Sequence, residues 1–128
     1  MNIPSEKRKE RYTYADYLSW PGGERWEIIA GEPYSMSPAP SRQHQQILGA
    51  LFAKFYNYLE DKACRVYPAP FDVRLFQEND KHDEIDTVVQ PDIVVVCDDK
   101  KLDDKGCQGA PDLIIEIISQ STAKKDLN

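Results

Sequence analysis

Two acidic residues lie beside apolar runs in the C-terminal half of the chain: Asp92 in "QPDIVVV" and Glu116 in "PDLIIEIIS". Because both alternating sets of side chains around Glu116 are branched and aliphatic, this segment predicts a strand buried on both faces. An unpaired carboxylate there would be strongly unfavourable. Oxygen ligands are preferred by Mg²⁺ and Mn²⁺, so we predict a metal site formed by Asp92 and Glu116, with the carbonyl oxygen of Ile117 as a further ligand.

The alternative is that Glu116 forms an ion pair with an Arg or Lys and that Asp92 only caps a strand. Glu27, in "WEII", is a third acid within an apolar strand. It could orient a metal-bound water or help to hold the ion, or it could be a solvent-facing hairpin residue. His44 precedes Ile47 by about one helical turn. This position favours a histidine at the edge of the core over a phosphate contact or a proton carrier.

The N-terminal half supplies a helix, a hairpin and a long helix. Thr13 and Asp16 are spaced as a capping box that begins a short helix. "RWEIIAGEPYSM" predicts a hairpin that turns near Gly31. Ser41 is a suitable N-cap for a helix over residues 42–61. Six apolar residues recur at helical spacing and predict the buried face of that helix: Ile47, Leu48, Leu51, Phe52, Phe55 and Tyr58.

The remaining chain predicts three or four strands and the beginning of a helix. "CRVYPAPFDVRLFQ" predicts one or two strands, "TVVQPDIVVVCD" predicts one buried strand, and "DKKLDDKGCQGA" reads as a polar connection to "PDLIIEIIS". A further helix is expected to begin within residues 119–122. This order is typical of an α/β sandwich with a mixed sheet. If the strands that carry Asp92 and Glu116 are neighbours, the two carboxylates face one edge of the sheet.

Composition narrows the range of functions. The 128 residues are 41% hydrophobic and carry a net charge of −6, so the chain is expected to be a single soluble domain. The charge is uneven: residues 1–65 hold 9 basic and 8 acidic residues, whereas residues 66–128 hold 7 and 14. A nucleic-acid site would therefore draw its positive charge from the N-terminal half, from a metal ion or from a second subunit.

Several motif classes are missing from the sequence. There is no glycine-rich phosphate loop, GxSxG or HExxH motif, which argues against P-loop and triad chemistry. The acidic loop "ENDKHDEID" lacks the spacing of an ion-binding loop. Three cysteines without CxxC spacing predict free thiols: Cys64, Cys97 and Cys107. No signal peptide or apolar span of membrane length is found, so a cytoplasmic protein without membrane contact is expected.

Three segments, "WEIIAGEPYSMSPAPSRQHQQIL", "QPDIVVV" and "APDLIIEIISQSTAKKD", resemble in order and spacing the putative restriction endonuclease family of the PD-(D/E)XK nuclease superfamily. The resemblance extends from Tyr12 to Asp126. It implies a restriction-endonuclease-like α/β fold, a mixed sheet flanked by helices, dependence on Mg²⁺ or Mn²⁺, and hydrolysis of DNA phosphodiesters. It also implies catalytic roles for Asp92, Glu116 and Glu27, with Glu27 as the acid contributed before the long helix. His44 matches a histidine often found at the same helix start in relatives, which makes it a candidate for substrate contact.

The sequence departs from the superfamily pattern at its lysine. The position two residues after the second acid is Ile118, which leaves Lys124 and Lys125 as nearby candidates for substrate contact. The resemblance implies one domain over residues 1–128, with residues 1–11 flexible and the C-terminal part of the family domain absent. An open sheet edge would favour a homodimer.

Three functions follow from these features. The first is a metal-dependent DNA endonuclease in which a lysine orients or deprotonates the attacking water. The second is a catalytically silent, nuclease-like module for interaction or dimerisation, favoured by the acidic charge and by the missing lysine. The third is a metal-dependent hydrolase of a small phosphoester. Competition between DNA and small phosphoesters would separate the first from the third.

Overall fold

The chain forms two β-sheets and two α-helices in the computed structural model, which describes residues 10–21, 25–36, 40–76 and 84–118. The larger sheet has the strand order β2-β1-β5-β4-β8-β7. Its strands are β1 Trp26–Ile29, β2 Glu32–Ser35, β4 Asp72–Leu75, β5 Thr87–Val89, β7 Leu102–Asp103 and β8 Gly106–Gln108. The smaller sheet has the order β3-β6-β9. Its strands are β3 Arg65–Pro68, β6 Ile93–Val96 and β9 Leu113–Ile115.

Among the strands in the described part of the chain, only β4 and β8 pair in parallel, so the larger sheet is mixed, as predicted. The α-helices are α1 Tyr14–Ser19 and α2 Arg42–Leu59, and a short 3₁₀ helix, η3, covers Asp99–Lys101. The architecture is a mixed α/β fold of the restriction-endonuclease-like kind. Among the residues that the structure describes, neither α-helix combines the length and the apolar composition needed to cross a bilayer.

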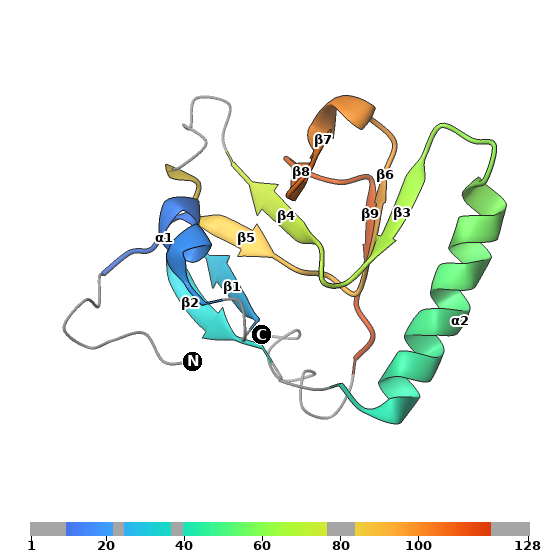
Figure 1. Ribbon diagram of the computed structural model, residues 1–128, viewed down its shortest axis with the longest axis horizontal. Helices are drawn as coiled ribbons and strands as arrows, with labels where there is room; N and C mark the ends of the chain where they lie inside the picture. Colours follow the sequence, from blue (N-terminus) through green and yellow to red (C-terminus); the bar gives the residue numbers. More distant parts are fainter. Residues whose placement is uncertain (1–9, 22–24, 37–39, 77–83, 119–128) are drawn as a thin grey trace.

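The elements stack in four layers, with α1 and α2 at opposite ends of the long axis (Figure 1). The alternation of side chains along each strand explains the order of the layers, because successive side chains point to opposite faces of a sheet. On one face of the larger sheet, Val88 packs against Tyr14 of α1. On its other face, Val73 packs against Val94 of β6. The opposite face of β6, at Ile93, packs against α2. Strand β6 is therefore covered on both sides and forms the centre of the core.

The N-terminal elements confirm the local signals in the sequence. Thr13 and Asp16 form the capping box of α1, with Thr13 N–H donating to Asp16 Oδ2 at 2.9 Å. The hairpin β1–β2 turns at Ala30 and Gly31, whose φ angles are positive, at 49° and 83° respectively. This conformation suits glycine at the second position of a tight hairpin turn. The Gly31 N–H donates to Asp86 O, which ties the turn to the chain before β5.

Helix α2 begins after Ser41, whose side chain accepts a hydrogen bond from His44 N–H, as the N-cap prediction requires. Its buried face is narrower than predicted. Five residues of α2 pack on the core beside the smaller sheet: Leu48, Leu51, Phe52, Phe55 and Leu59. Ile47 and Tyr58 are instead exposed, at 40% and 68%. These two side chains lie beside the contact between α2 and the smaller sheet, because that sheet is only three strands wide.

The prediction of one buried strand in "TVVQPDIVVVCD" is wrong. The segment forms two strands, β5 and β6, that belong to different sheets. Gln90, Pro91 and Asp92 connect them, and we call these three residues the linker. Proline cannot donate to a sheet ladder, so Pro91 marks the place where the chain leaves one sheet for the other.

The polar connection predicted for "DKKLDDKGCQGA" is also more ordered than expected. It contains η3 and the antiparallel pair β7–β8, and β8 extends the larger sheet beside β4. Gly106 has φ +136°, and a side chain there would collide with the Asp72 carbonyl. The approach of β8 to β4 therefore requires glycine at this position.

Strand β9 lies at the edge of the smaller sheet, which corrects the prediction that Glu116 sits in a strand buried on both faces. Leu113 and Ile114 are 44% and 49% exposed, and Glu116 follows the strand and is exposed. Apolar character on both sides of a strand predicts burial only when both faces are covered. Within the described residues, β9 pairs with β6 alone.

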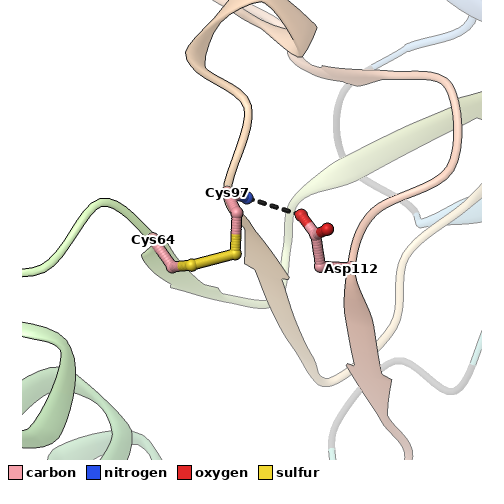
Figure 2. The surroundings of a disulfide bond; sticks show 3 residues. All are labelled: Cys64, Cys97 and Asp112. Atoms are coloured by element: carbon pink, nitrogen blue, oxygen red, sulfur yellow. Dashed lines mark hydrogen bonds between the residues drawn. A yellow bond between two sulfur atoms is a disulfide. The ribbon is translucent and has the colours of Figure 1, made fainter.

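Cys64 and Cys97 form a disulfide, so the prediction of free thiols is wrong for these two residues. They extend the antiparallel register of β3 and β6, in which Arg65 lies opposite Val96. Figure 2 shows the disulfide together with Asp112, whose Oδ2 accepts a hydrogen bond of 2.6 Å from Cys97 N–H. Cys107 is a buried free thiol, as predicted, and burial raises its pKa.

Several predictions lie outside the described residues. They are the helix start at 119–122, most of the acidic loop, and both candidate lysines, Lys124 and Lys125. Of residues 1–11, which were predicted to be flexible, the structure describes only Glu10 and Arg11, and Arg11 forms an ion pair with Asp86.

Candidate active site

The structure brings Asp92 and Glu116 together. Strands β6 and β9 pair antiparallel with Ile93 opposite Ile115, and the same register places Asp92 opposite Glu116. Asp92 N–H donates to Glu116 Oε1 at 3.1 Å. The two strands are therefore neighbours, which is the condition under which the acids can share one edge of the sheet; they are antiparallel, and the acids lie where β6 begins and β9 ends.

Asp92 is fixed by two further contacts. Its Oδ2 accepts a hydrogen bond of 2.7 Å from Ile117 N–H. The same oxygen lies 3.3 Å from His44 Nε2 at the N-terminal end of α2. Only 16% of the Asp92 side chain and 10% of the His44 side chain are exposed. The carboxylate is thus held between α2 and the residues that follow β9.

His44 is a core-edge histidine in its geometry. Its Nδ1 is buried and finds no hydrogen-bond partner in the part of the chain that the structure describes. Sequence reasoning placed His44 beside the apolar stripe of α2, but it did not pair His44 with Asp92. The two residues are 48 positions apart, and no local pattern links them.

Glu27 is buried, at 6% exposed, which excludes the solvent-facing alternative. Ile28, the next residue in β1, lies beside Val88 on the face of the larger sheet that α1 covers. Glu27 therefore points to the opposite face, toward the smaller sheet. Its Oε2 accepts a hydrogen bond of 2.8 Å from Gln90 N–H. Glu27 consequently reaches the linker two residues before Asp92.

Gln90 is a site residue that sequence reasoning missed. It is 7% exposed, and its side chain joins three polar partners from other elements: Tyr17, Arg25 and Asp72. A glutamine beside a proline in an apolar run is a signal of a buried polar position, since a buried amide requires hydrogen-bond partners. The identity of those partners could not be read from the sequence.

The three acids differ in their exposure to solvent. Glu116 is exposed, whereas Glu27 and most of Asp92 are covered. In the described residues no group of three or more His, Cys, Asp or Glu side chains is arranged to hold a metal ion. Asp92 and Glu116 thus form a pair of carboxylates at the surface end of the linker, with main-chain N–H groups bound to each.

The mixed α/β fold, with its six-stranded mixed sheet and a second sheet, is that of a restriction-endonuclease-like protein. Residues 14–128 match the Uma2 family, described as "Putative restriction endonuclease", and the chain belongs to this family. The resemblance inferred from the sequence is therefore confirmed, and a nuclease-like role is supported. Restriction-endonuclease-like families generally depend on a metal ion and act on DNA. A comparison with curated proteins found no match.

Proposed function

We propose that this protein is a Mg²⁺- or Mn²⁺-dependent endonuclease that hydrolyses DNA phosphodiester bonds. The observation that carries the proposal is the pairing of Asp92 with Glu116 through the 3.1 Å hydrogen bond. The two residues come from different strands and lie 24 positions apart in sequence. Family membership supports the same conclusion.

The residues present suit a hard divalent cation. Mg²⁺ is commonly bound by one or two carboxylates, with water completing its coordination, so two acids are enough. Asp92 Oδ2 is engaged by Ile117 N–H, while Oδ1 accepts no hydrogen bond from the described residues. We propose Asp92 and Glu116 as the ligands and the Ile117 carbonyl as a third. When bound, the ion would supply Lewis acidity, which favours attack by water and offsets charge at the phosphate.

The protein's own groups are proposed to orient the reactants. The Ile117 N–H and His44 fix the direction of the Asp92 carboxylate, and Glu27 fixes the main chain at Gln90. The burial of His44 favours this supporting role over direct contact with phosphate. Lys124 and Lys125 remain candidates for the cation that contacts the scissile phosphate or orients the attacking water.

A catalytically silent, nuclease-like module for interaction or homodimerisation is the second candidate. One oxygen of each acid already accepts a main-chain hydrogen bond, so the protein partly satisfies these charges without an ion. Ile118 also occupies the place of the superfamily lysine. The two candidates differ in one respect: only the nuclease requires the acids for a reaction.

The test is cleavage of supercoiled plasmid DNA with Mn²⁺, Mg²⁺ or a chelator, over a range of salt concentrations. We expect nicking that requires the metal, weakens with salt, and disappears in Asp92→Asn and Glu116→Gln. Asp112→Asn is the matched control, because Asp112 also follows a proline before a strand but binds Cys97 N–H instead. Nicking that persists in both site variants would refute the assignment. An excess of a small phosphoester should not compete with DNA.

A further inference from the structure

The linker is the direct connection between β5 in the larger sheet and β6 in the smaller sheet. Asp92 is its last residue and carries the carboxylate of the site. At this end, the linker is held by the second sheet and by α2, through Glu116, Ile117 and His44. The position of Asp92 relative to the larger sheet therefore depends on how the other end, Gln90, is held.

Gln90 is anchored through every polar group of its side chain. Its Nε2 donates to Tyr17 Oη at 2.9 Å and to Asp72 Oδ1 at 2.8 Å. Its Oε1 accepts from Arg25 Nε at 3.0 Å. In addition, its main-chain N–H donates to Glu27 Oε2. These partners lie on α1, on β4, and on β1 with the residue that precedes it, so Gln90 joins three separate segments.

The triangle of Gln90, Tyr17 and Asp72 is closed, because Tyr17 Oη also donates to Asp72 Oδ1 at 2.8 Å. Burial and the Asp72 carboxylate raise the pKa of Tyr17, which keeps the phenol protonated as a donor. A part-buried hydrogen-bonded network of this kind restricts its members to one arrangement. The triangle therefore fixes the start of the linker to the larger sheet and to α1.

We propose that Gln90, held by Tyr17 and Asp72, is a positioning residue that sets the place of Asp92 for metal binding. The inference rests on the proposed function for its metal readout, but its structural part can be tested without metal. Loss of the Tyr17 hydroxyl would let the linker fluctuate and would loosen the hydrogen bonds of Asp92 with Glu116 and Ile117. Groups that orient metal ligands typically alter metal affinity about 10- to 100-fold when removed.

The first measurement is amide hydrogen exchange by NMR on the metal-free chain. Tyr17→Phe should accelerate exchange at the Asp92 and Ile117 amides by about tenfold, the effect of losing one hydrogen bond. Gln90→Met should do the same or more. Gln108→Met is the matched control, because Gln108 is half-buried and donates to Asp103 instead. Unchanged exchange at both amides in Tyr17→Phe would overturn the inference.

The second measurement is Mn²⁺ affinity and the Mn²⁺ EPR spectrum of the same variants. We expect about tenfold weaker binding and an altered spectrum for Tyr17→Phe and Gln90→Met, with neither change for Gln108→Met. Tight binding with an unaltered spectrum in both variants would also overturn the inference. If wild-type protein does not bind Mn²⁺ but exchange is accelerated, the proposed function fails and the positioning of Asp92 by Gln90 stands.

Discussion

The disulfide between Cys64 and Cys97 should contribute substantially to stability. It closes a loop that spans 33 positions of the sequence, which in the chain-entropy model corresponds to about 3.7 kcal/mol at room temperature. With a urea m-value of about 1.5 kcal/mol/M, the unfolding midpoint of Cys64→Ser/Cys97→Ser should fall by about 2.5 M. Reduction of the wild type should shift the midpoint equally, while the double variant should not respond to reductant.

Thiol counting provides the decisive control. Denatured, unreduced protein should titrate one thiol, from Cys107, and reduced protein should titrate three. Folded protein should react slowly, because Cys107 is buried and burial raises its pKa. Three reactive thiols without reductant, or equal stability of the oxidised and reduced forms, would refute the reasoning.

Three further perturbations test the packing and the electrostatics. Asp103→Asn should lower the free energy of unfolding, measured with urea, by about 3 kcal/mol. The substitution leaves the fully buried Arg74 without the carboxylate to which it donates at 2.6 Å. Burial would raise the pKa of Asp103, but hydrogen bonds led by Arg74 lower it well below the usual range. The wild-type advantage should thus persist at neutral pH and decline progressively as the pH falls from about 4 through the lowered pKa of Asp103. Because the pKa of Tyr17 is raised, Tyr17 should be the last tyrosine to ionise in an alkaline titration followed by absorbance, and this last transition should be absent in Tyr17→Phe. The contribution of the Tyr17 phenol to stability is complete below about pH 10 and is lost as the pH rises through the raised pKa. Leu48→Ala should lower the free energy of unfolding by about 2–5 kcal/mol, and a loss under about 0.5 kcal/mol would contradict its place in the core.

Local signals in the sequence predicted local structure well. The capping box of Thr13 and Asp16, the hairpin at Gly31 and the helix after Ser41 each depend on residues a few positions apart. In each of these cases, the residues that determine the structure are visible in one short segment.

Non-local structure could not be read in the same way. The cysteine pairing requires the register of β3 and β6, and the separation of β5 from β6 depends on which sheet each joins. The exposure of Glu116 depends on β9 being an edge strand. The pattern of apolar residues shows which faces of a strand are suited to burial, whereas the position of the strand in the sheet determines which faces are buried.

The network around Gln90 shows the same limit at the site. Its partners Tyr17 and Asp72 lie 73 and 18 positions away. Glutamine, tyrosine and aspartate are common residues, and their types alone give no reason to join them. The sequence therefore singled out Asp92 and Glu116, but not Gln90, the uncharged residue that we propose to position Asp92.

Calorimetric titration of Mn²⁺ into the chain, beside Asp92→Asn and Glu116→Gln, tests the central claim most directly. The account predicts that the wild type binds Mn²⁺ and that each variant loses affinity by at least about tenfold, while Asp112→Asn binds as the wild type does. Wild-type protein that fails to bind, or variants that bind equally well, would contradict it and would favour the silent module.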